Sequence, residues 1–501
     1  MYKYFFCLVF LVLAKVVAAQ TLFFNKMYQP LPKYNFAESI KSVLVLPDGY
    51  LLSGVGSEYP FIPTNAAGWY CFKTDTMGNI VWQKEVIKTS YKYLGGGLLQ
   101  MPEGYLMYQT IKTFKSDDYG LHLIHIGTNG DVLWEKQIIN ENLYSSPCSI
   151  KHLEDGNLIV AGFTRNWVTE KLSDGYIAKL DTSGSILWEK KYGTAEYSDS
   201  FNEVLVLADG SLLMAGRRVS TTGKSQVWVL HTDSLGEKIS QKYFGMGVYD
   251  AASQIIPAQK GGYWLAGISY PDYTYKSDGD AALWHIDSLL KVDFDTIYPR
   301  KGSDSFVGIH ENLDGSLHLF GSDGQTDTGN GRLVKLSSNG TVIWDRSYSP
   351  DGLINERYDY LWDFAPTPDG GYVLCGQGLH TQSNIQDGWV FKVDSLGNTC
   401  FTLNCDSIAY PLGVENSPPL EEQEWFSLSP NPAQQQVTVS LPAPPTTPQQ
   451  LQVYDATGRE VQTHLLTQQQ TTISTANLPQ GIYYLRLQGH IESVKLVVLR
   501  W

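Results

Sequence analysis

Short runs of alternating apolar and polar residues fill most of the chain, and turn residues separate them. One such phrase is an acidic or polar residue and Gly followed by an apolar run, and it recurs about every 50 residues. Its seven copies begin at Asp48, Glu103, Asp155, Asp209, Gly261, Asp314 and Asp369. The alternation and the Gly, Asp and Asn turns favour strands over helices.

A second phrase has the same period and is clearest in YIAKLDTSGSILWEKKYG, Tyr176 to Gly193. It is an apolar run, a polar turn and a second run that carries an aromatic residue. The turns of its seven copies lie at Thr74, Gly127, Asp181, Asp233, Asp287, Ser337 and Asp394. The aromatic residue is Trp82, Trp134, Trp188, Phe294 or Trp344, whereas the fourth copy has Ser240.

Together the two phrases give four strands per repeat. Four strands in a period of about 50 residues, repeated seven times, predict an all-β fold, a seven-bladed β-propeller over residues 20–405. The seventh copy lacks its fourth strand. The segment TLFFNKMY has Phe24 and Tyr28 at the spacing of Trp188 and Tyr192, so we predict that it pairs with residues 388–394 and closes the ring.

The segment AKLDTSGSILW, from Ala178, resembles the tryptophan-docking motif of quinoprotein-type propellers. The resemblance implies that Trp188 and its equivalents stack at the interfaces between blades. The cofactor-binding quinoproteins have eight blades, and the adjacent Cys pair of those dehydrogenases is absent here. No cofactor is therefore predicted.

From residue 406 the amino-acid composition changes. Residues 406–424 are polar and contain Pro, which predicts a linker, and residues 425–501 contain seven short strand-like runs that predict a small immunoglobulin-like sandwich. Three motifs in this segment resemble the C-terminal sorting domain of the type IX secretion system: LSPNPA from Leu428, LQVYDATGREV from Leu451 and LPQGIYYLRL from Leu478. The resemblance implies a Bacteroidetes-like source, the secretion machinery as a partner, and release or attachment at the outer cell surface. The alternative is an ordinary adhesion module.

Residues 1–19 have the form of a signal peptide, with Lys3 before the apolar run FFCLVFLVLA and small residues before a cleavage site between Ala19 and Gln20. The alternative is a membrane anchor, although Lys15 interrupts the run. No later segment is apolar and long enough to span a bilayer. We therefore expect passage through the periplasm and the outer membrane.

The net charge of −14 gives no electrostatic support for a nucleic-acid partner or an anionic membrane surface. Five cysteines follow the signal peptide, too few for a disulfide scaffold. Cys400 and Cys405 are close enough to form a disulfide, and the other three are expected to be small buried residues. No CxxC pair is present, so a thiolate zinc site is not predicted. A monomer is expected.

One column of the repeat is basic in every copy: Lys73, His125, Lys179, His231, His285, Lys335 and Lys392. It could be a ring that binds an anion. The favoured interpretation is a structural partner in each blade, whose head pairs with an acid or a carbonyl group, because one ligand rarely needs seven equivalent residues. The three histidines belong to different blades, so no metal site is predicted.

Binding is expected on the face that carries the loops from the second to the third strand and the connections between blades, because the former loops are long and uneven. The candidate ligand residues are Tyr59, Phe61, Arg165, Trp167, Tyr270, Tyr273, Tyr275 and His380. Aromatic and polar loops suit a glycan or a protein surface. No nucleophile–base pair, HExxH, GxSxG or P-loop motif is present, so no catalytic residue is predicted. The alternative function is a secreted hydrolase or lyase that acts on polysaccharide.

Asp-Ser/Thr-apolar sequences resemble the O-glycosylation acceptor of Bacteroidetes-like bacteria. They begin at Asp75, Asp233, Asp287, Asp295, Asp394 and Asp406. Turn chemistry is the alternative explanation, because Asp followed by Ser or Thr also favours tight turns.

Overall fold

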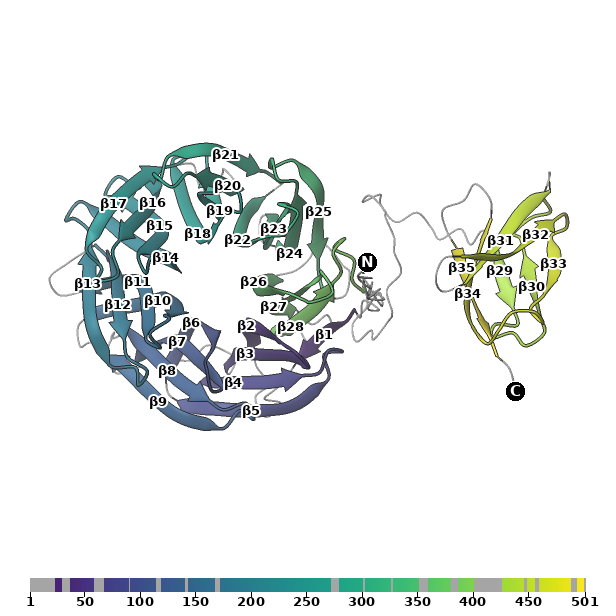
Figure 1. Cartoon of the computed structure of the whole chain (residues 1–501), viewed down its shortest axis with the longest axis horizontal. Helices are drawn as coiled ribbons and strands as arrows, with labels where there is room; N and C mark the ends of the chain where they lie inside the picture. The colour runs from purple at the N-terminus through teal and green to yellow at the C-terminus, as the bar shows by residue number, and fades with distance from the viewer. Residues whose placement is uncertain are drawn as a thin grey trace, which may run out of the picture. The chain divides into compact units, whose positions relative to one another are not determined.

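The computed structural model describes most of the chain as strands and turns (Figure 1). The described residues are 23–28, 37–57, 67–89, 91–113, 119–139, 143–166, 172–271, 279–300, 302–325, 328–350, 359–379, 386–400, 426–445, 448–455, 459–487 and 493–499. The chain divides into two compact units, residues 1–411 and 412–501. The signal peptide with Ala19 and Gln20, and the predicted linker, lie outside the described residues.

The first unit is a ring of four-stranded antiparallel sheets, the blades (Figure 1). The innermost strands, closest to the ring axis, are β2 (Ala37–Leu46), β6 (Tyr91–Gln100), β10 (Leu143–His152), β14 (Tyr197–Val206), β18 (Tyr249–Pro257), β22 (Ser303–Glu311) and β26 (Tyr360–Pro366). The second strands are β3 (Gly49–Ser57), β7 (Tyr105–Thr113), β11 (Leu158–Asn166), β15 (Leu212–Ser220), β19 (Tyr263–Tyr270), β23 (Leu317–Gln325) and β27 (Tyr372–Leu379).

The third strands are β4 (Ala67–Thr74), β8 (Tyr119–Ile126), β12 (Asp174–Leu180), β16 (Ser225–Thr232), β20 (Asp280–Ile286), β24 (Thr328–Leu336) and β28 (Gln386–Val393). The outer strands are β5 (Ile80–Thr89), β9 (Val132–Ile139), β13 (Ile186–Tyr192), β17 (Lys238–Phe244), β21 (Val292–Tyr298), β25 (Val342–Tyr348) and β1 (Asn25–Tyr28). The described residues of this unit thus form seven sheets, and we number the blades one to seven from β2 onward. The all-β propeller fold predicted from the repeat is confirmed.

Strand β1 closes the ring, as the spacing of Phe24 and Tyr28 predicted. It pairs antiparallel with β28, so that Asn25 lies opposite Phe391 and Tyr28 lies opposite Gly388. Blade seven therefore combines its outer strand from the start of the chain with three strands from the end of the repeat. Pairing β1 also covers what would otherwise be an open sheet edge.

Adjacent blades meet at an aromatic seam. In blades three, five, six and seven, the outer strand packs its Trp or Phe, and its Tyr, against the turn between the third and fourth strands of the next blade. A methyl group on Gly236 of that turn would lie 3.1 Å from both the Trp188 ring and the Tyr192 hydroxyl, so the close approach requires glycine. Four tyrosines donate a hydrogen bond to the turn glycine: Tyr28 to Gly78, Tyr192 to Gly236, Tyr298 to Gly340 and Tyr348 to Gly397.

Most residues of the basic column pair within their own blade, in agreement with the favoured interpretation. Lys73, Lys179 and Lys392 form ion pairs with the acid of the turn between the first and second strands, at distances of 2.5–2.7 Å. His125 and His285 reach a backbone carbonyl of the same turn. These residues connect the third strand to the turn between the first and second strands. Their charged groups are therefore engaged within single blades and do not converge on one shared anion.

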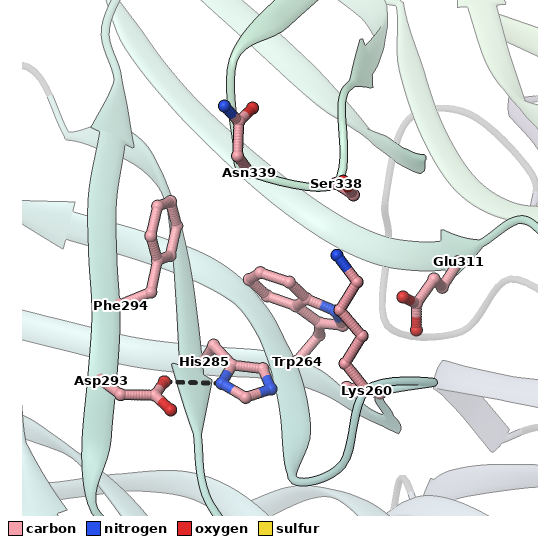
Figure 2. A pocket seen from close by; sticks show the side chains of 9 residues that line it. Lys260, Trp264, His285, Asp293, Phe294, Glu311, Ser338 and Asn339 are labelled. Carbon is pink, nitrogen blue, oxygen red and sulfur yellow. Dashed lines mark hydrogen bonds and ion pairs between the residues drawn. The ribbon is translucent and has the colours of Figure 1, made fainter. Parts of the chain in front are cut away.

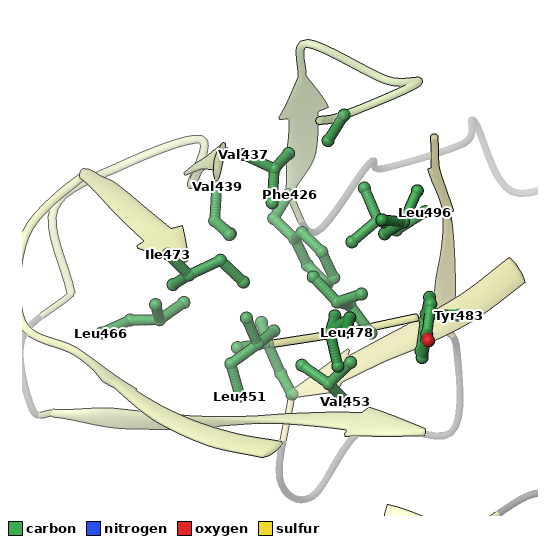
Figure 3. Packing of buried hydrophobic residues seen from close by; sticks show 14 of the residues in the cluster. Phe426, Val437, Val439, Leu451, Val453, Leu466, Ile473, Leu478, Tyr483 and Leu496 are labelled. Atoms are coloured by element: carbon green, nitrogen blue, oxygen red, sulfur yellow. The ribbon is translucent and has the colours of Figure 1, made fainter. Parts of the chain in front are cut away.

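The second unit is a sandwich of two small sheets with orders β29-β30-β33 and β32-β31-β34-β35. Its seven strands are β29 (Ser427–Ser429), β30 (Gln436–Ser440), β31 (Gln449–Asp455), β32 (Glu460–Leu466), β33 (Gln470–Ser474), β34 (Gly481–Leu487) and β35 (Ser493–Val498). Alternate residues of both sheets, such as Val437, Val439, Leu451 and Val453, point into one apolar core (Figure 3). The predicted immunoglobulin-like sandwich is confirmed.

Candidate functional site

The topology gives the ring two different faces. The short turns between first and second strands and between third and fourth strands lie on one face, which we call the turn face. The connections between second and third strands and between blades lie on the other, which we call the loop face. Of the eight candidate residues, the structure describes Arg165 in β11 and Tyr270 in β19, both at loop-face ends of their strands. Tyr59, Phe61, Trp167, Tyr273, Tyr275 and His380 lie outside the described residues.

Tyr270 belongs to a surface of tyrosines and arginines on the loop face of blades four and five. All its members are partly exposed, and they come from the loop-face ends of β14, β15, β17, β18 and β19. They are Tyr197, Arg217, Arg218, Tyr243, Tyr249 and Tyr270, and we call them the tyrosine–arginine surface. Arg165 lies in blade three and is not a member of this surface.

Arg218 is the fixed centre of this surface. Its guanidinium lies 4.3 Å from the ring centre of Tyr197 and 4.4 Å from that of Tyr243, which is cation–π geometry. Its Nε donates a 2.9 Å hydrogen bond to the fully buried carboxylate of Asp199. Burial raises the pKa of Asp199, and the ion pair with Arg218 opposes that rise. Arg218 is thus positioned by its partners before any ligand arrives.

Arg217 presents the second guanidinium. It donates a hydrogen bond to the hydroxyl of Tyr249, and the Tyr249 ring packs edge-on against Tyr270 at a centroid distance of 5.4 Å. The Tyr270 ring in turn lies against Gly279, where a methyl group would approach it to 2.6 Å. Rigid aromatic faces beside a guanidinium can stack on a flat ligand and form hydrogen bonds to its oxygens.

Of this surface, the sequence analysis named Tyr270 but not Arg217 or Arg218. The available signal was the pair of arginines in AGRRVS, at two positions of a second strand where the other repeats have no arginine. Tyr197, Tyr243 and Tyr249 were also missed, because they flank connections between blades that are short in the sequence.

A second charged cluster on the loop face is neutralised internally. Arg332 is 1% exposed and holds Asp345 with two hydrogen bonds of 3.1 and 2.8 Å, while Arg300 pairs with Asp323 at 2.6 Å. Burial raises the pKa of Asp304 to about 6, and the nearby Arg332 opposes the rise. These charges compensate one another within blade six, so the cluster is structural.

The disulfide and modification predictions concern other parts of the chain. Cys400 is disulfide-bonded, and its predicted partner Cys405 lies outside the described residues. Cys71 and Cys375 are buried free thiols, as expected. The turn aspartates accept backbone hydrogen bonds, for example Asp233 from Leu235 and Glu237, which is the turn chemistry considered above. The Asp-Ser/Thr hydroxyls on these turns are exposed at Thr76, Ser234, Ser288 and Ser395, and their glycosylation stays a prediction.

In the part of the chain that the structure describes, no group of three or more His, Cys, Asp and Glu side chains is placed to hold a metal ion. The same residues include no helix with the length and apolar character needed to cross a bilayer.

Several solved structures are similar to this chain at low identity. An ulvan lyase of a polysaccharide lyase family has a TM-score of 0.48 and 8% identity, and the match covers 70% of this chain and 91% of that one. The β-propeller domain of the Trilobed protease from Pyrococcus furiosus has a TM-score of 0.42 and 10% identity, and the match covers 72% of this chain and 96% of that one. PorZ, a surface component of the type IX secretion system of Porphyromonas gingivalis, has a TM-score of 0.27 and 10% identity, and the match covers 92% of this chain and 81% of that one. No curated protein matches the chain.

A family model identifies the second unit. Residues 427–499 match the secretion system C-terminal sorting domain. The match spans the strands from β29 to β35 and includes the three motifs noted in the sequence. The protein therefore carries a type IX secretion sorting domain behind a β-propeller, and it is exported to the cell surface or the extracellular space.

Proposed function

We propose that the exported propeller is a binding protein that recognises a glycan through the tyrosine–arginine surface. The observation that carries the proposal is the packing of two arginines among four partly exposed tyrosines on the loop face. Tyrosine rings offer flat apolar area to the C–H faces of sugar rings at little cost in conformational entropy. The guanidinium groups add directional hydrogen bonds to sugar hydroxyl or carboxylate oxygens.

Preorganisation favours binding over a purely structural role for this surface. Arg218 is held by Asp199 and two tyrosine rings, and Arg217 is held by Tyr249, so a ligand would not have to order either side chain. Arg218 forms an ion pair with Asp199, so it contributes hydrogen-bond donors and a flat face to this surface rather than net positive charge. Donors of this kind support selection of a ligand with many oxygen atoms.

Catalysis on polysaccharide is less well supported by the described residues. An acid–base mechanism needs two carboxyl groups that reach the substrate from a shared pocket. The two described aspartates with a pKa near 6 are Asp304 and Asp363. Asp304 is fully buried, and Asp363 accepts hydrogen bonds from Ser42 and Val43 of the neighbouring blade. Both are engaged in holding the ring together.

A glycan array probed with the exported protein, followed by calorimetric titration of any hit, tests the proposal. Arg217→Ala is expected to weaken binding about tenfold, since one charge-assisted hydrogen bond contributes about 1.5–3 kcal/mol. Tyr249→Ala should have a similar effect. Lys238→Ala, at the turn-face end of an outer strand, is the matched control and should bind like the parent protein. Equal affinity of Arg217→Ala and the parent for the hit would refute the assignment of this surface.

A further inference from the structure

Blade five departs from the repeat at the turn between its first and second strands. In the other six blades the turn carries an acid: Asp48, Glu103, Asp155, Asp209, Asp314 and Asp369. In blade five the same position is Lys260. The turn itself is unchanged, because the Ala258 amide donates to the Gly262 carbonyl at 3.0 Å, as Leu207 does to Ser211 at 2.9 Å in blade four.

The exchange of charge reorganises the basic column in this blade. His285 has no turn acid to pair with, and it instead places Nδ1 2.6 Å from Asp293 Oδ1 and Nε2 3.0 Å from the carbonyl oxygen of Gly261. Lys260 is exposed, and its ammonium forms no ion pair with any of the described residues. Blade five thus presents a lysine where the other blades have an acid, which in blades one, three and seven forms an ion pair with the lysine of the basic column.

The same blade also differs in its aromatic residues. The outer strand has Phe294 where most blades have tryptophan, and the second strand has Trp264 opposite His285. The residues equivalent to Trp264 are Leu51, Leu106, Ile159, Leu213, His318 and Val373. Trp264 packs edge-on against both His285, at 4.6 Å, and Phe294, at 5.7 Å. Blade five therefore has its tryptophan on the second strand and a smaller aromatic ring on the outer strand.

These exchanges leave a hollow of ≈ 260 Å³ on the turn face, between blades five and six (Figure 2). Trp264 and Phe294 form its aromatic side, and the Lys260 side chain projects into the space between them and blade six. Ser338 and Asn339, in a turn of blade six, lie at the opposite rim, where Ser338 supplies a hydroxyl. The Asn339 amide points away from Trp264 and Phe294 in this view, and its oxygen accepts a hydrogen bond from the Ser337 hydroxyl. The Glu311 carboxylate also lines the hollow and accepts the Gln259 amide hydrogen bond at 2.8 Å.

We propose that this hollow binds one acidic sugar unit of the uronic acid class. The carboxylate of the sugar would pair with Lys260, its C–H face would pack on Trp264 and Phe294, and one of its hydroxyls would bond with Ser338. The volume is just below the roughly 300–1,000 Å³ of pockets for drug-sized ligands, which suits a single sugar ring. The departures occur in one blade of the ring, as expected for a site that is used once. This site lies on the face opposite the tyrosine–arginine surface and is independent of the proposed function.

Isothermal titration of the full exported chain with sodium glucuronate tests the proposal, with glucose and sodium acetate as matched probes. We expect glucuronate to bind at least about tenfold more tightly than either probe, because only glucuronate offers both the carboxylate and the ring. Lys260→Asp should reduce glucuronate affinity by at least about tenfold. This variant should fold normally, since it installs the residue type that the other six turns use.

A further variant serves as the control. Lys238→Ala removes an exposed lysine elsewhere on the ring and should leave glucuronate affinity unchanged. The proposal is overturned if Lys260→Asp, with an unchanged melting temperature, binds glucuronate as the parent does. Equal affinity of the parent for glucose or for acetate would also overturn it.

Discussion

The Tyr28 hydroxyl donates a 2.6 Å hydrogen bond to the Gly78 carbonyl and thereby joins blade seven to blade one. The same bond links Tyr298 to Gly340 at 2.8 Å within the ring, where both residues belong to the continuous repeat. The closing seam is therefore built like the internal seams, although one of its strands comes from the other end of the chain. Asn25 holds β1 in blade seven, because it donates to the Pro350 carbonyl at 2.8 Å and accepts from the Trp389 indole at 2.7 Å.

Removal of β1 should destabilise the propeller strongly. Deletion of residues 23–28 from the mature chain exposes β28 as an open edge and uncovers the apolar cluster around Phe24. We expect a lower melting temperature and aggregation, measured by calorimetry and light scattering. Tyr28→Phe, which removes only the bond to Gly78, should cost about 1 kcal/mol, and Tyr298→Phe is the matched control at an internal seam. A deletion variant that melts like the parent would contradict the role of β1.

Ser240 and Leu290 compensate for each other at the seam between blades four and five. Ser240 stands where Trp188 stands in blade three, and Leu290 stands where the other blades have a turn glycine. Leu290 is 3% exposed, has a φ of 63°, and packs in the cluster that includes Phe244 and Met246. The leucine thus fills space that a tryptophan takes at other seams, at the cost of a strained backbone.

A double-mutant cycle tests this compensation. Ser240→Trp should cost about 1–3 kcal/mol by overpacking against Leu290. Leu290→Gly should lower the free energy of unfolding by about 2–4 kcal/mol because it opens a cavity. Release of the backbone strain at this position should offset part of that loss. The double variant restores the pattern of the other seams. Its loss of unfolding free energy, measured by urea unfolding, should therefore be at least about 1 kcal/mol smaller than the sum of the losses of the two single variants. Additive losses would show that the two positions do not share this space.

The sequence was enough to predict the ring and its closure, because Phe24 and Tyr28 keep the spacing of Trp188 and Tyr192. It also showed that Ser240 breaks the pattern. It did not connect Ser240 with Leu290, because the seam that joins them is a contact between blades that are about 50 residues apart in the chain. The tyrosine–arginine surface is harder still to predict. Arg218 acquires its role from Tyr197, Tyr243 and Asp199, which lie on two other strands, and no local pattern marks them as neighbours.

Arg332 should be a strong stabilising residue of blade six. Its buried guanidinium bonds to Asp345 and to the Tyr298 carbonyl, so Arg332→Met leaves a carboxylate and a carbonyl without this partner. Loss of one member of a buried ion pair costs about 3–5 kcal/mol, and urea unfolding should show it. Arg459→Met breaks the pair with Asp455, in which the arginine side chain is 78% exposed, and should cost less than about 1 kcal/mol. Equal losses in the two variants would be inconsistent with this account of Arg332.

Asp363 should make the stability of the propeller depend on pH. It accepts hydrogen bonds from the Ser42 hydroxyl at 2.8 Å and the Val43 amide at 3.0 Å across the seam between blades seven and one. Burial raises the pKa of Asp363 from 3.8 to about 6, although these hydrogen bonds and the charge of Lys151 oppose the rise. A carboxyl with a raised pKa in the folded state favours folding most below pH 4, and this contribution is lost as the pH rises through 6.

Asp363→Asn remains neutral at every pH and keeps an acceptor for Ser42. The melting temperature of the variant minus that of the parent should therefore become more positive between pH 4 and pH 7. Asp155→Asn is the control of opposite sign, because the hydrogen bond from Lys179 lowers the pKa of Asp155 to about 2. Asp155 is ionised above pH 5 in both the folded and the unfolded state. The melting temperature of Asp155→Asn minus that of the parent should therefore be constant from pH 5 to 7. A difference for Asp363→Asn that is equally flat from pH 4 to 7 would show that Asp363 does not titrate in the folded ring near pH 6.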